Sequence, residues 1–173
     1  WRFRTDAPEV RMHLSMTDGA DLLQLADGVF AGERDPWANA ANAAALVFES
    51  LSGLNWAGFY FLRGGELVVG PFQGRTACVR IALGSGVCGT AAARRETIIV
   101  PDVHAFPGHI ACDSASKSEL VVPMLSGDRL IGVLDLDSPR YGRFGAVETA
   151  LAEALATRLV AASDWRLAGI DGF

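Results

Sequence analysis

The chain has few charged residues, no dense basic run and no long hydrophobic run. Lysine and arginine number 15 against 20 aspartates and glutamates, for a net charge of −5. Nucleic acids and anionic membranes both select clustered cations, so we expect neither as a partner. Polar residues such as Asn39 and Glu153 interrupt the longest apolar stretches. These stretches fall short of the roughly 20 apolar residues that a membrane helix needs.

Cysteine is scarce, and its spacing is informative. The three cysteines, Cys78, Cys88 and Cys112, include no Cys-x-x-Cys pair. That spacing does not match a structural zinc site, even with His104 and His109 nearby. We therefore expect no bound metal and interpret both histidines as packing and hydrogen-bonding residues of a loop. Burial as small hydrophobic side chains is the simplest alternative role for the cysteines.

The composition predicts one globular domain. Half of the 173 residues are hydrophobic (50%), 20% are charged and the mean hydropathy is +0.25. Such a chain is neither disordered nor long enough for two ordinary domains. We expect a single domain over residues 1–173, with a core at about 20–163 and terminal extensions at 1–19 and 164–173. The start lacks a methionine and a secretory signal, which predicts a trimmed terminus and a cytoplasmic protein.

The hydrophobic periodicity predicts an α+β domain. A helix should begin at Asp35 and Pro36, because a carboxylate at the cap and proline in the first turn favour a helix start. Strands are expected at 56–62, 66–72, 77–83, 97–100, 118–125 and 129–137, with a short helix at 87–95. A last helix carries an apolar stripe of Phe144, Val147, Leu151, Leu155 and Leu159. Together they indicate an antiparallel sheet of about six strands flanked by helices.

Two of these strands carry side chains that suit a binding site. Side chains alternate along a strand, so Trp56 and Tyr60 lie on the same face of the first strand. For the same reason, Asp135 and Asp137 lie on the same face of the last strand. A core strand rarely carries two carboxylates on one face unless something outside the chain uses them. The alternatives are ordinary core packing for the two rings and, for Asp137, a strand end that emerges into solvent.

Glu119 can complete an acidic cluster only in one hairpin register. A plain two-residue turn at Gly127 and Asp128 would place Glu119 opposite residue 136, facing away from Asp135. A three-residue loop or one bulge would place Glu119 opposite Asp135. We therefore predict an irregular connection or a bulge in this hairpin.

Two of the cysteines lie where thiol chemistry is plausible. Residues 101–117 are too long and irregular for a simple connection, and such loops often carry function. Cys112 lies in this loop, where exposure and mobility would let it meet either other cysteine. Cys88 falls in the first turn of the short helix, with Ser85 as its cap, and the helix dipole there favours the thiolate.

The run VHAFPGHIACDSASKSELVVP at 103–123 is highly specific. It resembles the free methionine-(R)-sulfoxide reductases, which are built on a GAF domain. The similarity extends through 55–60, 70–74, 84–92 and 132–138, and it covers about residues 35–160. All three family cysteines are present, which distinguishes the chain from GAF domains that only sense ligands.

The resemblance implies a small pocket for free methionine-(R)-sulfoxide. The implied substrate-binding residues are Trp56, Tyr60, Ile110, Ala111, Glu119, Asp135 and Asp137. The two rings would enclose the sulfur end, and the acids would bind the ammonium group and the sulfoxide oxygen. Backbone N–H groups of the loop would bind the carboxylate. Crowding the three acids beside aromatic surface raises at least one pKa, so that one carboxyl can donate a proton to the oxygen.

The implied chemistry is attack of a cysteine thiolate on sulfur, a sulfenic acid and then a disulfide, which a thioredoxin-type donor reduces. We favour Cys112 as the nucleophile because it lies near Glu119 in sequence and can pair with Cys78 or Cys88. The helix-terminus argument supports Cys88 instead. No bound cofactor is expected, and a homodimer is compatible with the composition. The rival functions are a non-catalytic GAF sensor of a small ligand and a thiol switch without a substrate.

Overall fold

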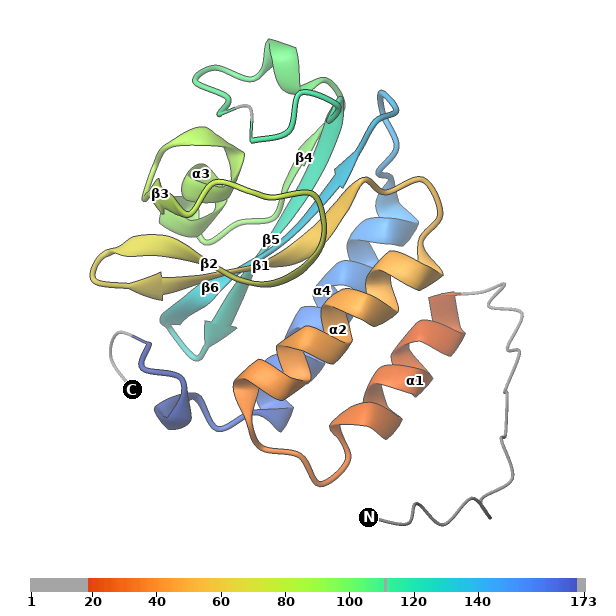
Figure 1. The fold of residues 1–173 in the computed structure, drawn as a ribbon, viewed down its shortest axis with the longest axis vertical. Helices are drawn as coiled ribbons and strands as arrows, with labels where there is room; N and C mark the ends of the chain where they lie inside the picture. The colour runs from red at the N-terminus through yellow and green to blue at the C-terminus, as the bar shows by residue number, and fades with distance from the viewer. Residues whose placement is uncertain (1–18, 111, 171–173) are drawn as a thin grey trace, which may run out of the picture.

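The computed structural model describes residues 19–110 and 112–170, which form one sheet covered on both faces (Figure 1). Its helices are α1 (Gly19–Phe30), α2 (Pro36–Ser50), α3 (Gly86–Arg94) and α4 (Ala146–Ala162), with short 3-10 helices η1 (Val103–Ala105) and η2 (Trp165–Leu167). Its strands are β1 (Trp56–Arg63), β2 (Glu66–Gly74), β3 (Arg80–Ala82), β4 (Ile98–Val100), β5 (Ser118–Ser126) and β6 (Arg129–Ser138). The predicted α+β class and the six-stranded antiparallel sheet are confirmed.

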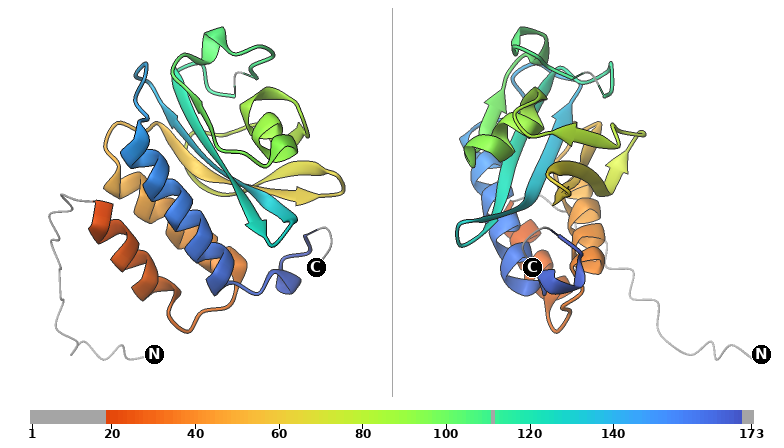
Figure 2. Two further views of the ribbon diagram at one scale, coloured as in Figure 1. Left: turned by 180° about the vertical axis from the view of Figure 1, so that it is seen from behind. Right: turned by 90° about the vertical axis from the view of Figure 1, so that its left-hand side faces the viewer.

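The start of α2 follows the sequence prediction. The Asp35 side chain accepts hydrogen bonds from the N–H groups of Trp37 at 2.8 Å and Ala38 at 3.0 Å. These are donors that the first turn of a helix otherwise leaves without partners. Pro36, the first helical residue, loses nothing by lacking an N–H. The left view of Figure 2 shows α1 beside α2 and α4, on the side away from the sheet.

The sheet has six strands in the order β3-β2-β1-β6-β5-β4, and all neighbours are antiparallel. Its central strands β1 and β6 approach closely at Gly132. A Cβ there would lie 2.0 Å from the Tyr60 carbonyl oxygen, so only glycine fits. The two strands that carry the predicted aromatic and acidic residues are therefore direct neighbours.

Alternation along the central strands divides the interior into two cores. Phe59, Phe61, Leu134 and Leu136 face α2 and α4. Residues of the opposite parity, such as Trp56, Tyr60 and Val133, face the side covered by α3 and its flanking loops. Asp135 shares that parity, as the period of two predicted.

The β5–β6 hairpin contains the predicted bulge. Its turn is the plain two-residue type, with Ser126 paired to Arg129, but the register shifts between Met124 and Leu125. The extra residue lies on β6, which places Glu119 opposite Asp137 rather than opposite Asp135 as predicted. Because the shift is one residue, Glu119 still faces the same side as the two aspartates.

The C-terminal segment differs in two ways from the sequence prediction. Val147, assigned to the apolar stripe of α4, is 70% exposed because it lies in the first turn, beyond the edge of the core. Trp165, which follows α4, is buried, and its ring lies 5.8 Å from that of Phe61. The core therefore continues past residue 163.

Within the described part of the chain, no helix combines the length and the apolar character needed to cross a membrane.

Candidate active site

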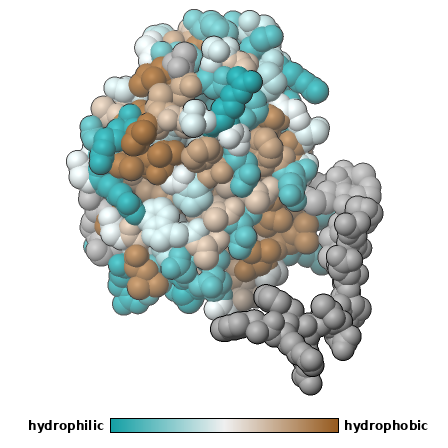
Figure 3. Space-filling view, in the orientation of Figure 1, coloured by the Kyte–Doolittle hydropathy of each residue, from teal (hydrophilic) through white to brown (hydrophobic). Residues whose placement is uncertain are grey.

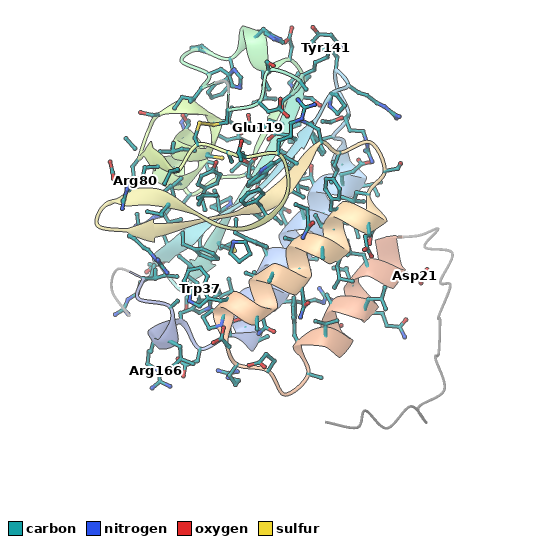
Figure 4. All side chains as sticks on the ribbon, viewed as in Figure 1. Asp21, Trp37, Arg80, Glu119, Tyr141 and Arg166 are labelled. Carbon is teal, nitrogen blue, oxygen red and sulfur yellow. A yellow bond between two sulfur atoms is a disulfide. The ribbon has the colours of Figure 1, made fainter. Side chains whose placement is uncertain are left out.

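A small cavity lies on the face of the sheet opposite α2 and α4, where the centre of a water molecule can reach about 30 Å³. Glu119, labelled in Figure 4, lines this cavity, in the upper half of the molecule as drawn. The predicted residues that line the cavity are Trp56, Tyr60, Cys88, Ile110, Cys112, Glu119, Asp135 and Asp137. The structure thus brings together residues from four elements and one loop. Ala111 lies outside the described residues.

The aromatic wall is a stack along β1 and β2. The Trp56 ring lies 5.8 Å from that of Tyr60 and 5.3 Å from that of Phe72, with interplanar angles of 28° and 17°. The Trp56 indole N–H donates to the Arg75 carbonyl at 3.1 Å, which leaves its apolar face for the cavity. Phe72 does not line the cavity but packs against the Trp56 ring, a contact that depends on the pairing of β1 with β2 and was not predicted from sequence.

The acidic wall is formed by the ends of β5 and β6. Glu119 and Asp135 are buried, and Asp137 is half-buried at the strand end, where Ser116 is its hydrogen-bond partner. Asp135 Oδ1 is buried without a hydrogen-bond partner among the described residues. Buried polar atoms are nearly always paired, so this oxygen is positioned for a group that the chain itself does not supply.

The electrostatics of this wall favour protonated carboxyls. Burial raises the pKa of Asp135 to about 7, against hydrogen bonds from Cys88 and Glu119 that lower it. Burial and the neighbouring aspartates raise the pKa of Glu119 well above its usual range. Burial and Asp135 do the same for Asp137. Carboxyls of this kind can donate a proton near neutral pH, as the crowding argument predicted.

Cys88 corrects one sequence prediction. It lies in the first turn of α3, as predicted, but the helix dipole does not make it a thiolate. Burial and the nearby Asp135 and Glu119 raise the pKa of the Cys88 thiol well above its usual range. The thiol stays protonated and donates to Glu119 Oε1 at 3.7 Å. Ser85, the predicted cap, makes no side-chain hydrogen bond at the helix start.

Cys78 and Cys112 form a disulfide, with their Cα atoms 5.4 Å apart. It joins the β2–β3 connection to the β4–β5 loop beside the cavity. A second contact holds the same two segments, because Arg75 lies 3.8 Å from Asp113. Asn55, just before β1, also donates to Asp113, at 3.1 Å. Cys78 and Cys112 therefore pair within the folded domain.

His109 lines the cavity, whereas the sequence predicted a packing and hydrogen-bonding residue of the loop. Its Nε2 lies 4.0 Å from Glu119 Oε2, and burial lowers its pKa. The signal that could have identified it is its position three residues before Cys112 in the same loop. His104 lies outside the cavity, where its ring contacts Asp102 at 3.0 Å.

Among residues 19–110 and 112–170, one group of side chains has the geometry to hold a metal ion. Cys88, Glu119 and Asp135 each offer one ligand atom, and these atoms lie within 4.8 Å of one another. The same atoms also suit an ammonium group or a protonated oxygen. The two disulfide-bonded sulfurs are not free to act as thiolate ligands in this state.

Comparisons with known proteins agree with this geometry. The GAF domain family matches residues 37–162. The free methionine-R-sulfoxide reductase of Escherichia coli is 54% identical over 125 residues, covering 72% of this chain and 76% of the relative. The crystal structure of the Neisseria meningitidis free methionine-R-sulfoxide reductase with its substrate is 44% identical with a TM-score of 0.82, covering 87% of this chain and 93% of that one. A Burkholderia vietnamiensis structure described as a GAF sensor is 58% identical with a TM-score of 0.82, covering 87% and 95%.

Proposed function

This chain belongs to the GAF domain family and, within it, to the free methionine-R-sulfoxide reductases, and on that basis we propose how its residues reduce free L-methionine-(R)-sulfoxide to L-methionine. One observation carries the proposal. Cys112 lines the same cavity as two aromatic rings and three protonatable acids, and it is already joined to a second cysteine, Cys78.

In the proposed complex, the substrate lies with its sulfur end against Trp56 and Tyr60. Glu119, Asp135 and Asp137 bind the ammonium group and the sulfoxide oxygen, and the oxygen of Asp135 that lacks a partner supports this assignment. The backbone N–H group of Ile110 binds the carboxylate, and the same role for Ala111 stays a prediction from the sequence. Because both ends of the amino acid are bound within a small cavity, a methionine inside a polypeptide cannot enter.

The Cys112 thiolate attacks the sulfoxide sulfur. The substrate sulfur gains two electrons, its bond to oxygen breaks, and a buried carboxyl supplies the proton as the oxygen is transferred to Cys112. The products are methionine and the sulfenic acid of Cys112. The Cys78 sulfur then attacks the sulfenic sulfur, water leaves and the Cys78–Cys112 disulfide forms. Cys88 takes no part as a nucleophile, because its buried thiol stays protonated.

A thioredoxin-type dithiol then reduces the disulfide and returns both thiols. Apolar residues gather on the surface over β3 and the segment that leads into α3 (Figure 3), where Val79 is 65% and Leu83 is 42% exposed. Val79 directly follows Cys78, so the disulfide lies next to apolar surface that a partner can cover. We place the protein in the cytoplasm, where such donors keep thiols reduced. A homodimer stays a prediction.

A non-catalytic GAF sensor is the alternative, and the description of the 58% identical Burkholderia vietnamiensis structure as a GAF sensor favours it. A sensor needs the cavity but not the paired cysteines beside it. A thiol switch needs the cysteines but not the acids. The two alternatives and the reductase therefore differ in whether methionine is released.

The test is turnover of free methionine-(R)-sulfoxide with dithiothreitol or thioredoxin as the reductant. We expect methionine from the wild type, none from the S epimer and none from Cys112→Ser. Cys88→Ser keeps a hydrogen-bond donor beside Glu119 and should still release methionine, because Cys88 is not the nucleophile. Persistent activity in Cys112→Ser would transfer the nucleophilic role to Cys88. Absence of methionine from the wild type would contradict the proposed function.

A further inference from the structure

His109 lines the cavity but has no role in the chemistry described so far. It lies at the end of a tight turn, where its N–H donates to the Phe106 carbonyl at 3.1 Å and Gly108 adopts a φ of +74°. Its side chain is 16% exposed, whereas that of Glu119, 4.0 Å away, is 8% exposed. A partly exposed imidazole therefore lies beside a nearly inaccessible acid, and both line the cavity that holds Cys112.

The proposed reaction needs a path for one proton. Its first step converts the Cys112 thiol and a sulfoxide into a sulfenic acid and a sulfide, without net uptake of protons. The S–H proton of Cys112 is lost as the thiolate forms, whereas the transferred oxygen receives a proton from a carboxyl. The carboxyl must then recover a proton before the next cycle. Both needs are met by one group that accepts the S–H proton of Cys112 and then gives a proton to the carboxyl.

We propose that His109 is this proton-transfer residue: its imidazole accepts the proton of the Cys112 thiol and returns a proton to Glu119 after each oxygen transfer. The 4.0 Å gap between Nε2 and Oε2 is one that a single bridging water or a small side-chain movement closes. The inference rests on the proposed function, and it adds a residue to that function rather than changing the substrate.

The surrounding charges agree with this direction of transfer. The titratable groups that share the cavity or act on His109 are Tyr60 on β1, Cys88 on α3, His104 on η1, Glu119 on β5, Asp135 and Asp137 on β6, and Asp113 on its own loop. Burial and His104 lower the pKa of His109, so the imidazole is neutral and free to accept a proton at pH 7. Burial and the aspartates raise the pKa of Glu119, so Glu119 takes up a proton readily.

The test compares His109→Gln with His104→Gln, a histidine variant of the same loop that lies outside the cavity. In His109→Gln we expect the rate of methionine formation in a single turnover to fall about 100-fold, the usual scale of proton-transfer catalysis, with substrate Kd changed less than threefold. Added imidazole should restore part of the rate, and the pH dependence of that rate should change. His104→Gln should match the wild type.

Three results would overturn the inference: a His109→Gln rate within twofold of the wild type, a loss confined to Kd, or an equal loss in His104→Gln. If His109→Gln does not fold, nitrogen NMR of the wild-type histidines decides, because an imidazolium at pH 7 for His109 in the reduced protein contradicts the inference. Absence of methionine from the wild type would instead contradict the proposed function itself.

Discussion

Asp135 carries a buried oxygen without a hydrogen-bond partner among the described residues, and burial raises its pKa to about 7. In its protonated form, the Asp135 carboxyl can donate a hydrogen bond to an oxygen of a ligand in the cavity. A bound ligand would therefore supply the partner that this buried oxygen lacks. Glu119 and Asp137 are shifted in the same direction. At the scale of single residues, the proposed function thus relies on acids whose protonated forms the fold favours.

The raised pKa makes stability depend on pH. Folded Asp135 keeps its proton up to about pH 7, whereas the unfolded chain loses it near the ordinary value of 3.8. The folded state therefore binds more protons across this window, and the free energy of unfolding falls as the pH rises through it. The Asp135→Asn side chain stays neutral, so the free energy of unfolding of this variant should decrease less with rising pH. At pH 8 the variant should be more stable than the wild type by on the order of 1–3 kcal/mol. It should also lose most of its activity.

Urea unfolding at pH 5 and pH 8 measures this difference. Asp128→Asn, in the exposed turn between β5 and β6, is the control and should unfold as the wild type does at both pH values. An Asp135→Asn protein with the wild-type dependence on pH would show that Asp135 is ionised in the folded state.

At the scale of elements, the bulge in β6 is what makes the acidic wall. Alternation alone predicts that Asp135 and Asp137 share a face, and the turn residues Gly127 and Asp128 predict the two-residue turn. The bulge could be predicted only from the need to bring Glu119 to the same face. Which strand carries the extra residue depends on tertiary packing, so the partner of Glu119 was predicted incorrectly.

The same limit explains the other departures. Sequence places Cys88 in the first turn of α3, but its protonation depends on burial and on acids about 30 and 50 positions away in the chain. His109 has no local pattern that distinguishes a cavity residue from a packing residue. The identity of the elements and most site residues follow from period and motif, whereas register, burial and cross-loop contacts need the folded chain.

Gly58 in β1 shows how the elements set the aromatic wall. A Cβ there would lie 2.3 Å from the Phe72 Cβ and 2.8 Å from the Trp56 ring. Gly58→Ala should therefore displace both rings and lower kcat/KM. It should also destabilise the protein by about 3 kcal/mol, the upper end of the usual range for an overpacked interior.

The matched control is Gly28→Ala in α1, where a Cβ would meet nothing within 4 Å. It should leave activity unchanged and add about 0.5 kcal/mol, because alanine favours a helix. Thermal unfolding and methionine release of both variants test the comparison. Equal stability of the two variants would contradict the close approach of β1 and β2.

At the scale of the whole molecule, the Cys78–Cys112 disulfide links two segments that are 34 positions apart in the chain. Closing a loop of that length restricts the unfolded chain, so the oxidised protein should be about 3–4 kcal/mol more stable than the reduced one. Urea unfolding with and without dithiothreitol measures the difference. In the double variant Cys78→Ser and Cys112→Ser, dithiothreitol should not change the stability. If dithiothreitol lowers the stability of that variant as much as that of the wild type, the difference does not come from this disulfide.

The most direct test of the central claim is a single turnover of Cys78→Ser with free methionine-(R)-sulfoxide, followed by trapping of sulfenic acid and mass spectrometry. Without a resolving partner, the account predicts one methionine released per protein and one oxygen atom on Cys112. Oxygen found on Cys88, or methionine formed with Cys112 unmodified, would contradict attack by Cys112.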